Sequence, residues 1–243
     1  MTRTITHAMI LAAGRGERMR PLTDHTPKPL LMVGGKPLIA WQIERLVAAG
    51  IRHIVINHAW LGEQFAVTLG DGERLGCTLY YSAETTALET AGGIIQALPM
   101  LHDEQSTLYK NTPFIVVSGD IYTEFHYASL HAMAAKMKEN KTLAHLVMVE
   151  NPPYNLRGDM VFGDDVDQKH WTYGNIAVFS PQLFLGLPAQ KLKLFPWLYT
   201  ACGSKDTTVK DATIAGRISG EIYTGIWENV GTPSQLQNLQ QRF

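Results

Sequence analysis

The sequence predicts an α/β fold in a single domain, built on a doubly wound, mainly parallel sheet. Short apolar runs of strand length alternate along the chain with segments of helical spacing, and runs such as Phe114–Val117 are apolar at every position. Such strands are expected where helices cover both faces of a parallel sheet. In a doubly wound sheet, ligands bind beyond the carboxyl ends of the strands, so the residues that follow each strand carry the most information.

Five apolar runs in the first 150 residues predict strands, at Ala8–Ala12, His53–Ile56, Thr78–Tyr81, Phe114–Val117 and Leu143–Val149. One helix is predicted by the apolar face of Ile39, Ile43, Leu46 and Val47, and Gly50 provides its stop. Further helices are predicted at Trp60–Leu69, Thr90–Leu98 and Tyr127–Met137.

The pattern loosens after Glu150. Loops are predicted at Asn151–Pro153 and Gly163–Lys169, and strands at Tyr173–Phe179 and Glu221–Ile226. The last segment, Thr232–Gln241, predicts a terminal helix with Thr232 as N-cap and Pro233 in the first helical position.

Composition and charge are those of an ordinary soluble globular protein. The chain has 243 residues, 45% apolar and 18% charged, with a formal net charge of -1. The chain lacks the excess of basic residues that a nucleic-acid partner usually requires. No apolar stretch is close to the length of a transmembrane span. Cys77 and Cys202 are too few for a disulfide framework and match no zinc motif, so we expect a reducing, cytoplasmic location. A monomer and a homodimer are both open.

The chemistry is indicated most strongly just after the first strand. The segment reads Leu11-Ala12-Ala13-Gly14-Arg15-Gly16-Glu17-Arg18-Met19-Arg20-Pro21-Leu22-Thr23, and Pro27-Lys28-Pro29-Leu30 follows. Small residues let a backbone approach phosphates and donate N–H groups to them. The spacing is not that of a Walker A loop, and Met19 replaces the third glycine of a dinucleotide fold. An isolated Gly-x-Gly would more often be a plain turn. The interpretation as a phosphate-binding loop therefore depends on the longer string of residues.

This string, called the signature loop below (residues 11–30), resembles the signature of the sugar nucleotidyltransferase family. The family includes mannose-1-phosphate guanylyltransferases and glucose-1-phosphate thymidylyltransferases. The resemblance continues through Gly34–Ile39, Val117–Asp120 and Trp227–Thr232. It implies transfer of a nucleotidyl group from a nucleoside triphosphate to a sugar 1-phosphate, with release of pyrophosphate.

The resemblance also implies roles for individual residues. Arg18, Lys28 and Asp120 match the catalytic positions, where cations stabilise charge on the reacting phosphates. Mg²⁺ would be bound by Asp120 and Asn229, although many relatives have an Asp at the second position. Arg15 and Arg20 could contact the phosphates or could equally well be solvated surface charges. The implied nucleotide-binding set is Leu11, Ala12, Ala13, Gly14, Gly16, Glu17, Arg18, Lys28, Glu84 and Ser118.

The resemblance further divides the chain into a mainly nucleotide-binding half, 1–120, and a mainly sugar-phosphate half with the terminal helix, 121–243. Sugar hydroxyls would be bound by Glu89, Asp159, Gly174 and Asn175. Glu84 would contact the base, but a carboxylate can accept from uracil or guanine, so that contact leaves the base open.

Asn57–Gly62 and Leu88–Gly93 most resemble the bacterial family members that use UTP and N-acetylmuramate 1-phosphate in cell-wall recycling. Two alternatives remain open at this point. The first is guanylyl transfer to mannose 1-phosphate. The second is a catalytically silent relative that binds sugar nucleotides as a regulator, which the amide at Asn229 keeps open.

Overall fold

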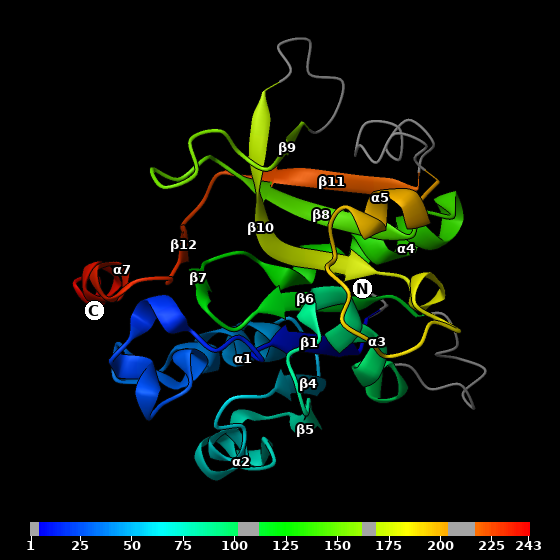
Figure 1. The fold of residues 1–243 in the computed structure, drawn as a ribbon. Helices are drawn as coiled ribbons and strands as arrows, with labels where there is room; N and C mark the ends of the chain where they lie inside the picture. Colours follow the sequence, from blue (N-terminus) through cyan, green and yellow to red (C-terminus); the bar gives the residue numbers. More distant parts are fainter. Residues whose placement is uncertain (1–4, 102–111, 162–168, 204–216) are drawn as a thin grey trace.

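A central sheet of eight strands runs through the molecule, as the computed structural model of the chain shows (Figure 1). The structure describes residues 5–101, 112–161, 169–203 and 217–243, so all of the predicted loop Gly163–Lys169 except Lys169 lies outside the described residues. The strand order is β11-β8-β10-β6-β1-β4-β5, with β9 paired to β10. Along this path β10 is antiparallel to both neighbours and the other pairs are parallel, which confirms the mainly parallel sheet.

The strands of this sheet carry the apolar runs of the sequence. Their bounds are His7–Leu11 (β1), His53–His58 (β4), Thr78–Ala83 (β5), Phe114–Ser118 (β6), Ala144–Val149 (β8), Met160–Val161 (β9), His170–Phe179 (β10) and Ile218–Tyr223 (β11). Four of the five interior strands, β1, β4, β6 and β8, are buried almost throughout because helices cover both faces.

Two helical layers enclose the sheet. One apolar core lies between the sheet and α3 and α5, and a second lies between the sheet and α1, α2 and α4. The helices span Leu38–Ala48 (α1), Glu63–Leu69 (α2), Glu89–Leu101 (α3), Leu130–Asn140 (α4), Trp197–Ala201 (α5) and Pro233–Gln240 (α7). None of the helices within the described residues is both long and apolar enough to cross a membrane.

Short elements connect these layers. Two small antiparallel sheets pair Met32–Val33 (β2) with Lys36–Pro37 (β3) and Ile121–Thr123 (β7) with Trp227–Asn229 (β12). Single 3₁₀ turns lie at Glu17–Met19, Leu22–Asp24, Lys28–Leu30, Glu73–Leu75, Tyr127–Ser129 and Pro181–Leu183.

A buried amide fixes the small sheet of β7 and β12 to α1. Gln42 on α1 is fully buried; its Nε2 donates to the carbonyl of Ile121 at 2.9 Å, and its Oε1 accepts from the Tyr127 hydroxyl at 2.6 Å. Burying an amide is costly unless its polar atoms are paired, so Gln42 has few alternative positions. It therefore locks β7, which begins directly after Asp120.

Several predicted element bounds need correction. The helix predicted from Trp60 begins only at Glu63, because Leu61 has a φ of 51° that a helix cannot contain. The strand predicted at Glu221–Ile226 begins earlier and ends at Tyr223, since its length follows its pairing with β8. Ile226 leaves the sheet, and its carbonyl accepts instead from the backbone N–H of Glu124 at 3.0 Å.

The terminal helix α7 has the predicted cap. The Thr232 hydroxyl accepts from the N–H of Gln235 at 3.3 Å, and α7 follows the strand that carries Asn229.

We expect Thr232→Ala to lower the free energy of unfolding by about 1 kcal/mol, since an N-cap bond is lost. Denaturant titration measures the change. Thr68→Ala, at an exposed position on α2, is the control and should have almost no effect; equal losses in the two variants would contradict a capping role.

Candidate active site

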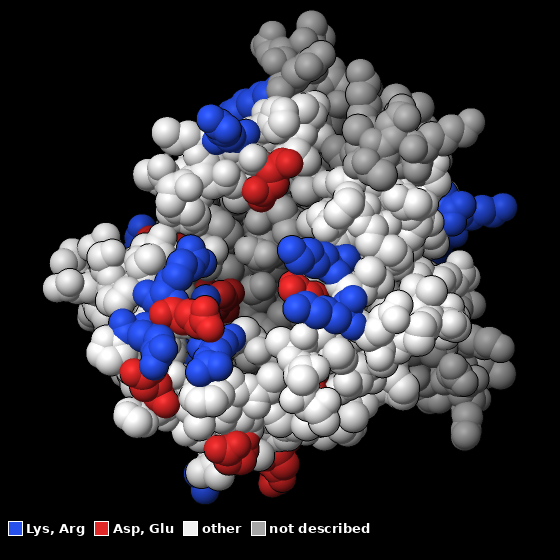
Figure 2. All heavy atoms as spheres, viewed as in Figure 1, with Lys and Arg blue, Asp and Glu red and all other residues white. Residues whose placement is uncertain are grey.

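A cleft of about 320 Å³ opens at the carboxyl ends of β1, β4 and β6, the end of the sheet where ligands are expected. On the face drawn in Figure 2, the surface is hollowed near the middle, with Lys and Arg side chains on both sides and Asp and Glu among them. Of the predicted site residues, the structure brings together around the cleft Leu11, Ala12, Ala13, Gly14, Gly16, Lys28, Glu84, Glu89, Ser118 and Asp120.

The signature loop folds tightly on itself where it enters the cleft. Gly16 has a φ of 68°, and a Cβ there would lie 3.1 Å from a Thr23 methyl and 3.2 Å from Lys28 Cβ. The Thr23 hydroxyl donates to the Gly16 carbonyl at 2.8 Å. Gly16 therefore meets both a conformational and a space requirement that larger residues cannot meet without strain.

The segment after β4 holds the outer side of this loop. Trp60 Nε1 donates to the carbonyl of Thr23 at 3.2 Å, and Arg15 stacks over the Trp60 ring at 4.5 Å. Arg20 pairs with Asp24 at 2.6 Å. Arg15 and Arg20 thus lie on the surface with partners outside the cleft lining, as the surface alternative for them predicts.

A buried polar pair forms one wall of the cleft. Glu84 is 6% exposed, and its two carboxylate oxygens accept from Asn57 Nδ2 at 2.6 Å and from the backbone N–H of Leu88 at 2.8 Å. Asn57 Oδ1 in turn accepts from the backbone N–H of Ala12 at 2.9 Å. The signature loop is therefore tied to β4 and to the turn before α3 through two side chains.

Asn57 received no role in the sequence analysis, although it stands at the end of a predicted strand, where functional residues are expected. A base contact by Glu84 stays a prediction, and it would have to use lone pairs that the two existing bonds leave over. The neighbouring His58 packs against Phe65. Burial lowers the pKa of His58, against the opposing effect of Glu63 and Glu84, and so favours the neutral imidazole.

The backbone segments that carry the predicted metal residues lie side by side where β7 and β12 pair. The backbone N–H of Val230 donates to the carbonyl of Asp120 at 2.9 Å, which places Asn229 diagonally across from Asp120. The Asp120 carboxylate forms an ion pair with Lys28 Nζ. Asn229 Oδ1 is buried and has no hydrogen-bond partner among the residues that the structure describes.

This arrangement fits a magnesium ion. A buried amide oxygen without a partner is costly, and a hard cation would satisfy it. In the described ranges of the chain, no three His, Cys, Asp or Glu side chains form a metal cluster. Mg²⁺ is commonly held by only one or two protein ligands together with substrate phosphates, so Asp120 and Asn229 would suffice as protein ligands.

Two predicted nucleotide-binding residues lie outside the cleft lining. Arg18 extends towards the turn after β12, where a Cβ on Gly231 would lie 3.1 Å from Arg18 Nη2. Arg18 is therefore close to the strand of Asn229. The Glu17 side chain is 75% exposed and lies 3.9 Å from Arg15.

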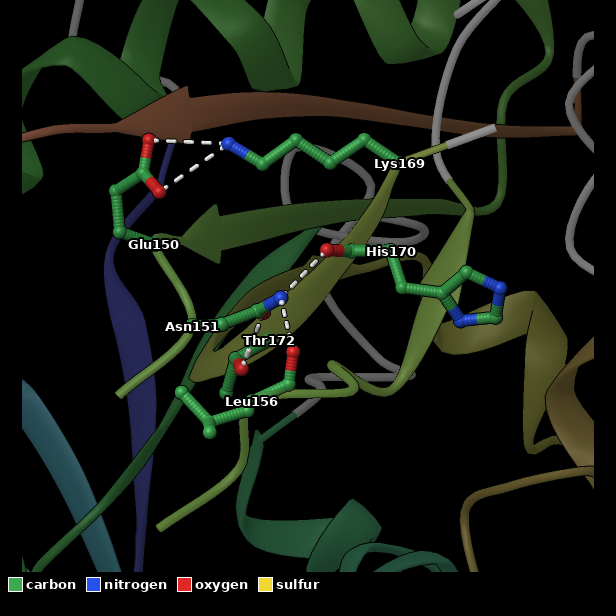
Figure 3. Close-up of polar contacts among 6 residues, drawn as sticks. All are labelled: Glu150, Asn151, Leu156, Lys169, His170 and Thr172. Atoms are coloured by element: carbon green, nitrogen blue, oxygen red, sulfur yellow. Dashed lines mark hydrogen bonds and ion pairs between the residues drawn. The ribbon is translucent and has the colours of Figure 1, made fainter. Parts of the chain in front are cut away.

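The predicted sugar residues Asp159, Gly174 and Asn175 form a separate group around β10. Figure 3 shows the scaffold of the loop before β9: Asn151 Nδ2 donates to the carbonyl of His170 at 2.8 Å, and its Oδ1 accepts from the Thr172 hydroxyl at 2.9 Å. The Asp159 carboxylate accepts from Asn155 Nδ2 at 2.8 Å and from the backbone N–H of Tyr173 at 2.9 Å. Asp159 thus holds this loop against β10, a role that the sequence analysis did not foresee.

The same loop brings Tyr154 towards the predicted metal residues. Burial raises the pKa of Tyr154, a backbone hydrogen bond with Asn229 opposes the rise, and the charges of Asp120 and Arg18 also act on it. Tyr154 lies outside every motif used in the sequence analysis. Only the fold of the loop brings it beside Asn229.

A cleft of about 320 Å³, a glycine-rich loop and a paired lysine and aspartate thus lie together at the carboxyl ends of a mainly parallel sheet, where phosphate-bearing ligands are expected. The chain belongs to the nucleotidyl transferase family, whose model matches residues 7–169.

Two relatives and one solved structure are similar to the chain over most of its length. The chain is 43% identical to the N-acetylmuramate alpha-1-phosphate uridylyltransferase of Neisseria meningitidis over 96% of both chains. It is 28% identical to the mannose-1-phosphate guanylyltransferase catalytic subunit beta of Drosophila pseudoobscura, over 95% of this chain and 60% of that protein. Its fold matches a Bacillus anthracis structure described as a glucose-1-phosphate thymidylyltransferase, with a TM-score of 0.74, 18% identity and coverage of 97% and 94% of the two chains.

The buried pair of Asn57 and Glu84 gives a prediction. Asn57→Asp retains the acceptor for Ala12 but sets a second carboxylate against Glu84, so it should lower the free energy of unfolding by about 2 kcal/mol. The double variant Asn57→Asp/Glu84→Gln restores a donor opposite an acceptor, because the new glutamine amide can donate to the new carboxylate while its oxygen still accepts from Leu88. It should regain most of the loss in denaturant titrations. Simple addition of the two single effects would show that the pair is not coupled.

Proposed function

We propose that the chain transfers a uridylyl group from UTP to N-acetylmuramate 1-phosphate, releasing pyrophosphate, with Mg²⁺ as cofactor. The observation that carries the proposal is the meeting of the signature loop, Lys28 and Asp120 around one cleft, in a chain that is 43% identical to a relative named for this reaction. The 28% identity to a guanylyltransferase makes GTP with mannose 1-phosphate the competing substrate pair.

In the proposed reaction, a phosphate oxygen of the sugar phosphate attacks the α-phosphorus of UTP, and the bond from that phosphorus to the pyrophosphate oxygen breaks. Small residues at Ala13 and Gly14 leave room for phosphates beside the backbone N–H groups of the loop. Lys28 and Arg18 stabilise the negative charge that gathers on the phosphate oxygens. The attacking oxygen is already ionised near neutral pH, so no general base is needed.

Asp120 and Asn229 would hold the Mg²⁺ ion. When bound, the metal supplies positive charge that offsets the charge of the reacting phosphates. The ion pair of Lys28 with Asp120 keeps the lysine at the cleft, within reach of a phosphate of the bound nucleotide.

The sugar would lie between Glu89 at the cleft and the group around β10. The lactyl carboxylate of N-acetylmuramate requires a cation or an amide, and we propose Arg157 or Asn175 for this contact. Both lie in the part of the chain that Asp159 and Asn151 hold in place. Cys77 and Cys202 are buried free thiols, in keeping with a proposed cytoplasmic location.

A first prediction concerns the metal. Asp120→Asn should lower turnover by about 100-fold or more without unfolding the chain, because the only carboxylate ligand is lost while size is kept. Asp71→Asn, in the turn before β5, is the matched control and should leave turnover unchanged. Pyrophosphate release measured with and without excess chelator tests the cofactor directly. Full turnover in chelator would refute the role of Mg²⁺.

A second prediction concerns the substrates. The specificity constant for UTP with N-acetylmuramate 1-phosphate should exceed that for GTP with mannose 1-phosphate by at least about tenfold, since polar groups that fit one substrate are left unpaired by another. Pyrophosphate release for each pair, with the crossed pairs as controls, measures this ratio. A guanylyl preference of that size would overturn the proposed substrates and leave the reaction class intact.

A further inference from the structure

Strand β10 carries an irregularity beside the predicted sugar group. Its pairing with β8 shifts between Tyr173 and Ile176, and Asn175 has a φ of 56°. A Cβ on Gly174 would lie 2.9 Å from the carbonyl oxygen of Val147, so the backbone comes unusually close to β8 there. Bulges of this kind redirect the backbone groups of a strand.

The carbonyl that the bulge turns out of the ladder has a specific partner. Trp227 Nε1 donates to the Gly174 carbonyl at 2.8 Å. The Trp227 ring also packs against the core between the sheet and α1, α2 and α4. Trp227 therefore connects β12 to the central sheet, although β12 pairs only with β7 in the strand ladders of the described residues.

Asn229 lies two residues after Trp227 in the same strand. Side chains two apart in a strand point to the same side, so the rotation of β12 that places the indole also places the Asn229 amide. That amide oxygen is buried and without a partner among the described residues. Its direction is not set by a hydrogen bond of its own, and it depends on how β12 is held.

We propose that Trp227 is a positioning residue for the metal site, and that its indole bond to Gly174 holds β12 so that Asn229 presents its amide oxygen beside Asp120. This inference rests on the proposed function, because it requires a metal at Asp120 and Asn229. It also ties the metal site to the sugar side, since the bulge that supplies the acceptor is anchored by Asp159 through the N–H of Tyr173.

Trp227→Phe separates positioning from packing. Phenylalanine keeps an aromatic ring in the core and removes the N–H donor. We expect the affinity for Mn²⁺, measured by calorimetry or electron paramagnetic resonance with a non-hydrolysable UTP analogue bound, to fall about fivefold, as one lost hydrogen bond implies. A second variant with 3-benzothienylalanine at position 227 keeps the two-ring shape and lacks only the donor, so it should show the same loss.

Trp41→Phe is the matched control. Trp41 Nε1 donates to the carbonyl of Val33 at 3.1 Å, so this variant also loses one indole bond to a backbone carbonyl, but that bond joins α1 to β2 and does not hold β12 to the central sheet. The phenylalanine ring can still pack against Tyr122 of β7, as Trp41 does. It should bind Mn²⁺ like the unaltered protein. Unchanged Mn²⁺ affinity in both variants at position 227, or an equal loss in Trp41→Phe, would overturn the inference.

Asn229→Ala distinguishes the inference from the function on which it rests. If Asn229→Ala weakens Mn²⁺ binding and the variants at position 227 do not, the positioning role fails alone. If Asn229→Ala leaves Mn²⁺ binding unchanged, the proposed metal site is wrong and the role of Trp227 falls with it.

Discussion

A buried carboxylate must have its oxygens satisfied, and the way Glu84 meets this requirement organises the cleft. One oxygen accepts a hydrogen bond from the side-chain amide of Asn57, and the other accepts from the backbone N–H of Leu88. Asn57 is then left with its own oxygen directed at the N–H of Ala12. The end of β1, the end of β4 and the start of α3 are fixed relative to one another by these three bonds. Breaking any one of them would leave a buried polar group unpaired, so the arrangement acts as a unit.

The other side of the site depends on the chain returning from its second half. After β11 the chain leaves the central sheet. The next strand, β12, pairs with β7, which begins directly after Asp120. Gln42 holds β7 from α1, and Trp227 holds β12 from β10. The two candidate metal residues thus come from positions more than a hundred residues apart in sequence. Their meeting depends on tertiary contacts that no local pattern contains.

The difference between local sequence signals and tertiary contacts explains how far the sequence could predict the structure. The strands β1, β4, β5, β6 and β8 follow from apolar runs, and the terminal helix follows from its cap, because both signals are local. The positive φ of Leu61 and the bulge in β10 have no such local signal. In the site, the small residues of the signature loop line the cleft, while their contact with a nucleotide stays a prediction. Asn57, Tyr154 and the scaffolding bonds of Asp159 became visible only in the fold.

The pairing of Lys28 with Asp120 bears on how a metal would enter the proposed site. The protein offers one carboxylate and one neutral amide, and the carboxylate is already balanced by the lysine. Such a site carries little net negative charge, so Mg²⁺ gains little by binding to it alone. A bound triphosphate changes this balance, because it brings several negative charges and offers Lys28 a new partner. Metal and nucleotide are then expected to bind as a unit, and an amide at Asn229 makes the metal depend more strongly on the nucleotide than an aspartate would.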